Sequence, residues 1–276
     1  MSRTSVKKRW TKEEEDFLRK NSKTMSYQEL ADSLGRTKDG VSKRVRSLNL
    51  EIKNTFNKYE YNINYFSKID TEEKAYWVGF IAADGCLLER GRLKIGLQAS
   101  DSSHLTKFNN ALDSNKEVKI TTSKKDGKSY PSALLVFDSV NLVEDLKKIN
   151  IFPMKTYDMK LPKISEELMP HYLRGLFDGD GSFYVGNRKD RDRKVFSIEL
   201  IGYNSPFMTE IQDFLKQQGI NMNWYLKRES TAKLSISNKK DCLNLINYLY
   251  CGFKTEVVCL ERKREKALEI RALCLV

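Results

Sequence analysis

The chain contains the heptapeptides GFIAADG at residues 79–85 and GLFDGDG at residues 175–181. Each follows an apolar run and ends in an aspartate and a glycine, and glycine commonly terminates a helix. We therefore predict two helices whose last residues are Asp84 and Asp180. Small residues on one face of each helix would let the two backbones approach closely. These small residues are Gly79, Ala83, Gly175 and Gly179.

The two aspartates would then meet at the negative ends of two helix dipoles. When two carboxylates lie so near each other, their repulsion disfavours the ionised form of both. A divalent cation between them removes this repulsion. Because carboxylate oxygens suit hard cations, we predict a shared Mg²⁺ site at Asp84 and Asp180, completed by Gly85 and Gly181. The chain has only two histidines, and its five cysteines include no C-x-x-C pair, so a zinc site is not expected.

The chain of 276 residues is basic, with 49 lysines and arginines against 37 aspartates and glutamates, a net charge of +12 and a pI near 9.3. This excess favours polyanionic partners, with nucleic acid first. No apolar stretch approaches the roughly 18 residues of a membrane helix, and no apolar segment follows the basic N-terminus as in a signal peptide. We therefore expect an intracellular protein of the cytoplasm, nucleoid or organelle matrix, without membrane contact.

Residues 1–50 have the pattern of a small helical domain. Helix-capping residues stand at Thr11 and Ser26, each with a glutamate three positions later, and at Thr37. Gly35 would end the second helix before a basic third helix. A tight turn followed by a basic helix is typical of helix-turn-helix domains.

This segment resembles Myb/SANT-like and other helix-turn-helix domains through Trp10-Thr-Lys-Glu-Glu-Glu, Glu29-Leu-Ala and Val41-x-x-Arg44. The resemblance implies that the third helix contacts DNA. The side chains that helix phase directs toward DNA are Lys38, Ser42, Lys43 and Arg46. The alternative is a protein-interaction domain with a solvated basic face.

Residues 51–70 are rich in Asn, Lys and Tyr without a clear period, which indicates a linker or, alternatively, an arm along a DNA groove. The remainder, 71–276, contains an internal repeat, with repeat one at about 71–152 and repeat two at about 163–254. Each repeat has the pattern helix, two strands, helix, two strands, helix. A charged helix at about 255–271 closes the chain. The predicted fold class is therefore α+β, with two related halves after a small all-α domain.

The paired motif resembles the LAGLIDADG homing endonucleases of the single-chain, two-motif type. Two apolar-Gly-x-x-x-x-Asp-Gly copies, each followed by strands, carry the resemblance over roughly residues 70–255. It implies two pseudo-symmetric αββαββα halves that form a DNA-binding saddle, with Asp84 and Asp180 as catalytic acids. A metal between two carboxylates can activate water and neutralise a phosphate, so no histidine base is needed.

The resemblance further implies a monomer that needs no protein partner and makes Mg²⁺-dependent double-strand breaks in DNA at a long target site. The breaks would carry short 3′ overhangs. Mn²⁺ should substitute for Mg²⁺, and Ca²⁺ should bind without cleavage. The gene would belong to a mobile element, as in intron homing.

Two sets of side chains would support this activity. Alternation along the predicted strands places one set on the sheet face that reads DNA: Arg90, Arg92, Lys94 and Gln98 in the first half, and Arg188, Arg191, Arg193, Ser197 and Glu199 in the second. The second set, by resemblance, supports catalysis through Lys239 and Lys227, with pocket residues Asp101, Asn204 and Lys240. The first half has Asp138-Ser139 where the second has Lys239, so we expect asymmetric catalytic support.

Two alternative functions use the same scaffold: a DNA-binding transcription regulator without cleavage, and an intron RNA maturase. Retention of both motif aspartates counts against the regulator. The helix-turn-helix pattern favours duplex DNA, because the major groove of RNA is too narrow to admit a helix.

Overall fold

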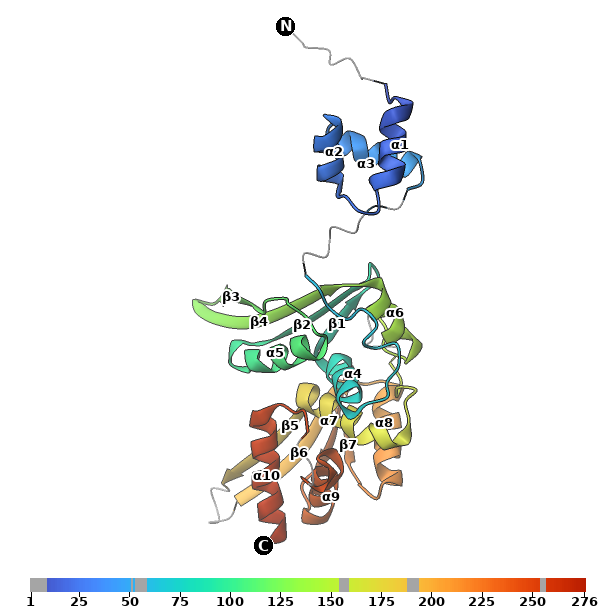
Figure 1. Cartoon of the computed structure of the whole chain (residues 1–276). Coiled ribbons are helices and arrows are strands. Elements are labelled where there is room, and N and C mark those ends of the chain that lie inside the picture. Colours follow the sequence, from blue (N-terminus) through green and yellow to red (C-terminus); the bar gives the residue numbers. More distant parts are fainter. Residues whose placement is uncertain (1–8, 51, 53–58, 154–158, 188–193, 254–256) are drawn as a thin grey trace. The chain divides into compact units, whose positions relative to one another are not determined.

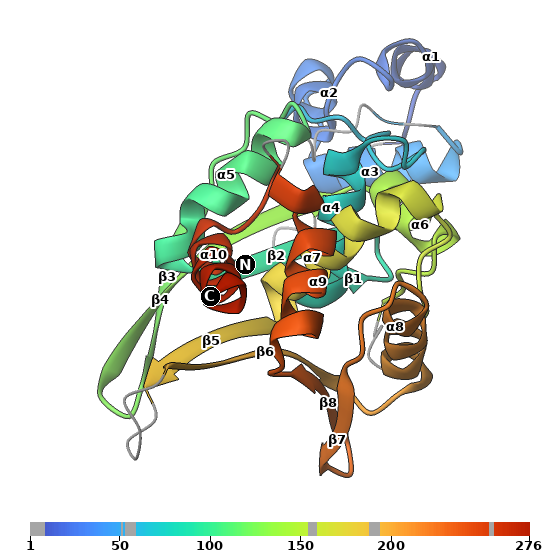
Figure 2. The same cartoon turned by 90° about the horizontal axis from the view of Figure 1, so that it is seen from below.

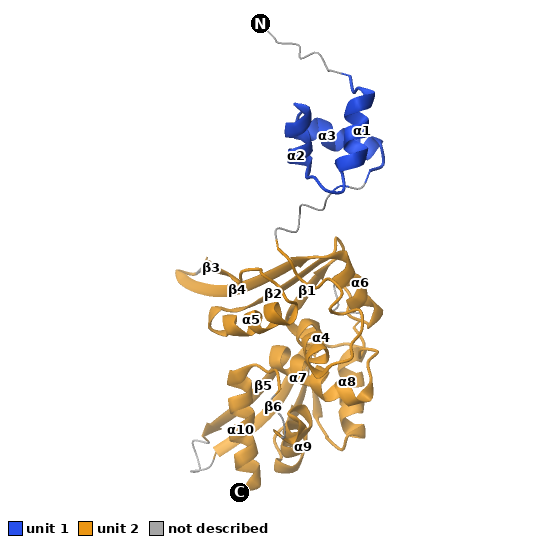
Figure 3. Ribbon diagram, viewed as in Figure 1, with its two compact units in different colours: residues 1–58 blue, residues 59–276 orange. Residues whose placement is uncertain are grey.

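The computed structural model describes residues 9–50, 52, 59–153, 159–187, 194–253 and 257–276. The chain divides into two compact units, residues 1–58 and residues 59–276 (Figure 3). The predicted α+β class is confirmed, with a small all-α unit and a unit that contains two four-stranded antiparallel sheets. No helix in the described ranges is both long enough and apolar enough to span a membrane.

The N-terminal unit consists of three short helices, α1 (Lys12–Asn21), α2 (Tyr27–Leu34) and α3 (Lys38–Ser47). Both predicted capping boxes are present, because the Thr11 and Ser26 side chains accept from backbone N–H groups three residues on, where glutamates return the bond. Gly35 ends α2 in the left-handed conformation, with φ of 58°. The buried core of the unit consists of Leu18, Leu30, Ala31, Val41 and Val45.

The second unit repeats one topology. Its first half contains α4 (Glu72–Asp84), β1 (Gly85–Leu88), β2 (Arg92–Gln98), η1 (Ala99–Asp101), α5 (Ser102–Ala111), β3 (Lys119–Lys125), β4 (Lys128–Asp138) and α6 (Val140–Lys148). Its second half contains η2 (Glu166–Leu168), α7 (Met169–Asp180), β5 (Gly181–Asn187), β6 (Lys194–Tyr203), α8 (Pro206–Gln217), β7 (Asn223–Arg228), β8 (Thr231–Ile236), α9 (Lys239–Leu249) and η3 (Cys251–Phe253), followed by α10 (Glu261–Leu275). The strand orders β1-β2-β4-β3 and β5-β6-β8-β7 match position by position.

Helices α4 and α7 pack side by side where the two halves meet (Figure 1). A Cβ atom on Gly79 would overlap the Tyr172 carbonyl oxygen, and a Cβ atom on Gly175 would overlap the Tyr76 carbonyl oxygen. The two backbones are therefore closer than any larger residue would allow. Figure 2 shows the helices of this unit gathered on one side and the strands of both sheets along the other.

Residues 59–70, which we expected to belong to a linker, are part of the second unit. Phe66 is buried and stacks on Phe108 with ring centroids 6.4 Å apart, and the Asn62 N–H donates to the Leu112 carbonyl at 2.8 Å. These side chains fill gaps between other elements, so they show no helical or strand period. The other linker residues, 51 and 53–58, lie outside the described residues.

The last helix begins at Glu261, six residues later than predicted. The preceding backbone is held in the interior instead. The Arg174 guanidinium donates to the Val258 carbonyl at 2.8 Å, and the Leu260 N–H donates to the Asp178 carboxylate at 2.7 Å. Backbone groups that bond to buried side chains in this way are not available for helical bonds.

Candidate active site

Asp84 is the last residue of α4 and Asp180 is the last residue of α7. An ideal Cβ atom on Gly179 would lie 3.3 Å from Oδ2 of Asp84, so the Asp84 carboxylate lies against the residue that precedes Asp180. Gly85 and Gly181 follow the helices as the first residues of β1 and β5, in extended conformation. The packing of α4 on α7 thus brings the two predicted acids together.

Lys263, in the first turn of α10, supplies a cation to this site that the sequence pattern did not reveal. Its Nζ donates to the carbonyls of Phe177 at 3.0 Å and Gly179 at 2.9 Å in the last turn of α7, where the Phe177 carbonyl also accepts from the Gly181 N–H. Burial lowers the pKa of Lys263 to about 8, while the charges of Asp84 and Asp180 act in the opposite direction. One buried lysine therefore caps α7 and lies in the field of both acids.

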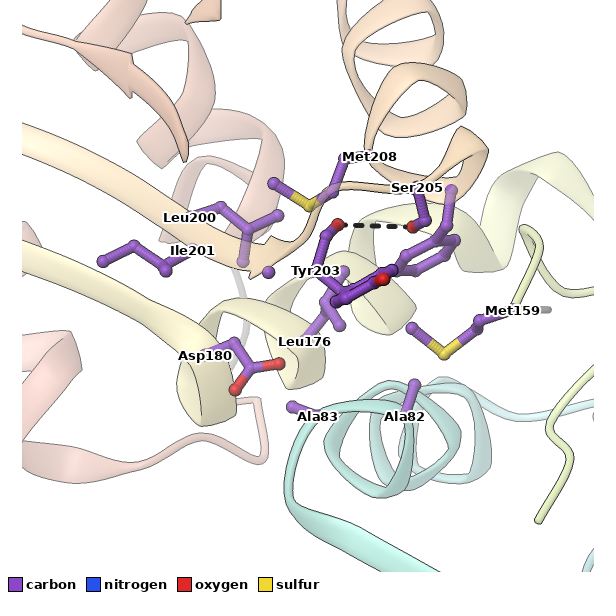
Figure 4. A pocket seen from close by; sticks show the side chains of 12 residues that line it. Ala82, Ala83, Met159, Leu176, Asp180, Leu200, Ile201, Tyr203, Ser205 and Met208 are labelled. Atoms are coloured by element: carbon purple, nitrogen blue, oxygen red, sulfur yellow. Dashed lines mark hydrogen bonds between the residues drawn. The ribbon is translucent and has the colours of Figure 1, made fainter. Parts of the chain in front are cut away.

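Each aspartate borders a cavity of its own half. On the side of the first half, Asp84 lines an open cavity of about 700 Å³ together with Gly179, the end of β2 and Arg262. On the side of the second half, Asp180 lines a cavity of about 110 Å³ together with Ala83 and the end of β6 (Figure 4). The two cavities are built from matching elements, because Gly179 and Ala83 each precede a motif aspartate.

A buried hydrogen-bond chain lies behind the acids. The Tyr76 hydroxyl donates to Asp178 Oδ2 at 2.7 Å and lies 2.8 Å from Nε2 of His104. Because an ionised Asp178 can only accept and a hydroxyl has one proton, His104 Nε2–H donates to the tyrosine oxygen. Burial raises the pKa of Asp178 to about 6, against the lowering effect of the Leu260 N–H and the Tyr76 hydroxyl. Asp178 therefore ties α7 to α4 and to the segment before α10.

The predicted pocket residues are placed differently in the two halves. Asp101 is buried and accepts from Gln98 Nε2 at 3.0 Å and from Arg262 Nε at 3.0 Å, within the cavity that Asp84 lines. Asn204 is exposed and donates to the Glu229 carbonyl at 3.2 Å, which holds the turn between β7 and β8. Asn204 lines neither aspartate cavity.

Lys239, the first residue of α9, is exposed and lines neither aspartate cavity. Lys240 is exposed beside Lys239, and Lys227 is exposed on β7, an edge strand. The sequence argument placed these lysines by analogy alone, and the cation near the acids comes from α10.

The predicted DNA-reading residues of the first half are exposed along β2 and the turn before it. Arg90 and Lys94 are exposed, and Arg92 pairs with Asp138 at 2.6 Å. Gln98 is exposed at the strand end and bonds to Asp101.

In the second half, Ser197 is half-buried on β6, and Glu199 pairs with Lys233 on β8 at 2.8 Å. The predictions for Arg188, Arg191 and Arg193 fall outside the described residues.

On α3, Lys38, Lys43 and Arg46 are exposed and Ser42 is half-buried. Lys43 pairs with Asp39 at 2.7 Å, with both side chains about three-quarters exposed. The buried face of α3 carries Val41 and Val45, so the basic residues occupy its outer face.

Part of the chain is similar to a known protein family. Residues 173–251 match the LAGLIDADG endonuclease family. The match begins within α7, includes the second motif and ends after α9. The first half repeats the strand order of the second. The comparison with curated proteins found no match.

Several solved structures are similar to this chain in fold. The I-LtrWI LAGLIDADG homing endonuclease bound to target DNA is 12% identical, with a TM-score of 0.50 over 77% of this chain and 91% of that chain. The homing endonuclease I-GzeII in complex with its DNA target is 18% identical, with a TM-score of 0.48 over 73% and 89%. Full-length DUF199/WhiA from Thermatoga maritima is 21% identical, with a TM-score of 0.48 over 77% and 64%.

Proposed function

We propose that this chain is a site-specific DNA endonuclease that cuts both strands of a long target site. The observation that carries the proposal is the packing of α4 on α7, which brings Asp84 against Gly179, next to Asp180. The LAGLIDADG endonuclease match over residues 173–251 supports it, because that match includes the second motif. The net charge of +12 agrees with a polyanionic substrate.

The two aspartates fit a hard divalent cation. Among the described residues, no group of three or more His, Cys, Asp or Glu side chains could hold a metal ion. A cation at the motif ends would therefore use the Asp84 and Asp180 carboxylates, the backbone at Gly85 and Gly181, water and the DNA phosphate. Mg²⁺ suits such a set, because it commonly binds through one or two carboxylates and substrate phosphates and keeps several waters.

When bound, the cation supplies charge neutralisation at the phosphate and a more acidic water. The residues of the chain hold the two aspartates in position. The hydrogen bonds from Lys263 to the end of α7 fix the backbone next to Asp180, and the glycines of the helix pair fix the separation of α4 and α7. Pre-organised groups of this kind need little rearrangement when charge develops on the phosphate.

The remaining parts of the proposal concern DNA contact and products. Exposed basic residues on and beside β2 would contact DNA, and α3 of the N-terminal unit would contact it as a helix-turn-helix domain. We further propose a monomeric enzyme that uses Mg²⁺ or Mn²⁺, is inactive with Ca²⁺, and leaves short 3′ overhangs.

Cleavage selection from a randomised duplex library tests the proposal. The library is incubated with wild-type protein in Mg²⁺ or Ca²⁺, and the new DNA ends are sequenced. Asp84→Asn and Asp180→Asn are tested on the selected site. Asp213→Asn, which removes an exposed acid on α8, is the matched control.

We expect discrete double-strand ends in Mg²⁺ with wild type and with the Asp213 variant, and a loss of about 100-fold or more in cleavage with either motif variant. If the protein binds a specific site but cleaves it with no metal, the endonuclease proposal is wrong and the protein is a DNA-binding regulator. Preferential binding of structured RNA over duplex DNA would indicate the maturase instead.

A further inference from the structure

Arg262 joins the two halves of the second unit at the cavity that Asp84 lines. It is the second residue of α10, which follows the second half, yet its Nε donates to Asp101 of the first half at 3.0 and 3.2 Å. Both side chains line the cavity of about 700 Å³ together with Asp84 and Gly179. The sequence pattern placed this arginine within a charged terminal helix and assigned it no role.

The guanidinium is held through Nε, and Arg262 lines the cavity of Asp84 and a neighbouring one with His104 and Glu265. Asp101 has only 8% of its side chain exposed, and Gln98 donates to the same carboxylate at 3.0 Å, so the anchor is fixed. The Arg262 side chain is 51% exposed, and its two terminal nitrogens make no hydrogen bond with the described residues. Its terminal N–H groups are arranged in the planar fork that matches phosphate oxygens.

The cavity of the second half has a different lining. This cavity, lined by Asp180 and Ala83, includes Met159, which lies between the two halves in the chain as Arg262 lies after the second. Figure 4 shows Met159 next to Ala82 at this cavity. The residues that line the first cavity therefore include a cation, Arg262, whereas those that line the second include no lysine or arginine.

We propose that Arg262 is a phosphate-contacting residue of the first half, held in place by Asp101 as a positioning residue. The inference rests on the proposed endonuclease function and adds a basic group beside Asp84 in the first half, where Asp138 stands in the place of Lys239 and pairs with Arg92. One DNA phosphate near Asp84 would accept hydrogen bonds from the free edge of the guanidinium. The corresponding phosphate of the second half would have no such partner at Met159.

The test measures DNA binding and does not depend on cleavage. The probe is a duplex selected from a randomised library for binding to the full-length wild-type protein in Ca²⁺. Each phosphate near the cut positions is replaced in turn by a neutral methylphosphonate. The variants are Arg262→Gln, Arg262→Lys and Asp101→Asn, and Lys266→Gln removes one half-exposed charge elsewhere on α10 as the matched control.

We expect Arg262→Gln to weaken binding about tenfold and to reduce the slope of log K against log salt by about 0.9. One methylphosphonate should weaken binding of wild type and of Lys266→Gln but leave Arg262→Gln unaffected. Arg262→Lys and Asp101→Asn should keep the wild-type salt slope, because the charge remains, and should reduce the effect of that same methylphosphonate.

The inference is wrong if the loss of DNA affinity from Arg262→Gln adds to the loss from every methylphosphonate. It is also wrong if Arg262→Gln binds DNA as Lys266→Gln does. Either result would leave the endonuclease proposal standing as long as wild type binds and cuts its site. If the library yields no bound duplex, the proposed function fails, and the role of Arg262 fails with it. If Arg262→Gln unfolds, Arg262→Lys still tests the inference through its smaller response to the same methylphosphonate.

Discussion

Asp178 and Asp180 are two residues apart in α7, and their surroundings differ completely. Asp178 is 1% exposed and accepts from the Tyr76 hydroxyl and the Leu260 N–H, whereas Asp180 is exposed at a cavity. Residues two apart on a helix do not share a face, so one acid joins the interior and the other reaches solvent. In α4 the residue that matches Asp178 is Ala82, which is buried without a polar partner to satisfy.

The same interior predicts a pH effect at His104. Burial lowers the pKa of His104 to about 3, and the nearby Lys107 charge acts in the same direction. A lowered pKa in the folded state gives stability that is present above the unfolded pKa of about 6.5 and is lost as the pH falls toward 3. At pH 4.5 the loss should amount to about 3 kcal/mol relative to neutral pH.

The substitution His104→Gln removes this titration and keeps a donor for the Tyr76 oxygen. Urea unfolding of both proteins at pH 7.5 and pH 4.5 measures the effect, because the other titrating groups are common to both. The stability advantage of wild type should shrink by about 3 kcal/mol at the lower pH. A constant difference between the two proteins would contradict the assignment of a neutral, buried His104.

At the scale of elements, the α4–α7 pair depends on glycines that let backbone meet backbone. Gly79→Ala would place a methyl group against the Tyr172 carbonyl, and neither backbone can yield without moving a half. We expect a loss of about 3 kcal/mol or more in unfolding free energy, even though alanine favours the helix by about 1 kcal/mol. Urea unfolding measures this loss, and the displaced acids should also lower cleavage.

Gly96→Ala on β2 is the matched control for this prediction. A Cβ atom there would have its nearest neighbours at 3.7 Å in Leu134 and 3.8 Å in Ala133, which is ordinary contact. This variant should be as stable as wild type or slightly more stable, because alanine restricts the unfolded chain. Equal effects of the two substitutions would show that the close approach at Gly79 does not limit the packing.

Helix ends were predictable where their signals are local. The Thr11 and Ser26 capping boxes, the Gly35 terminus and the Thr37 cap are all present, because each needs only residues three or four apart. The sequence of β3 carries no local signal of a strand. Its residues before Lys125 are exposed and show no apolar alternation, so only pairing with β4 defines the strand.

At the scale of the whole molecule, the boundary of the second unit is a testable feature. A fragment of residues 59–276 keeps Phe66 in its site, whereas a fragment of residues 71–276 removes it and exposes the surface beneath, including Phe108. Loss of one buried aromatic side chain costs about 3–5 kcal/mol. We expect the urea unfolding of the longer fragment to match the unfolding of the second unit within the full chain.

The shorter fragment should be less stable by about 3 kcal/mol or more, and it should aggregate more readily. Phe66→Ala in the longer fragment is the matched control, because it removes the same contact without shortening the chain. Equal stability of the two fragments would support the prediction that residues 51–70 form a linker.

The sequence by itself determined the repeated motif, the helices that end at Asp84 and Asp180, and the helix boundaries of the N-terminal unit. Those features depend on small residues, glycines and caps that act over a few positions. Only the tertiary structure decided that Arg262 lines the cavity of Asp84 and that Lys263 binds the end of α7 next to Asp180, while Lys239 lines neither aspartate cavity. The physical reason is that those side chains are placed by burial and pairing with residues far away in the chain, and no local pattern encodes such a partner.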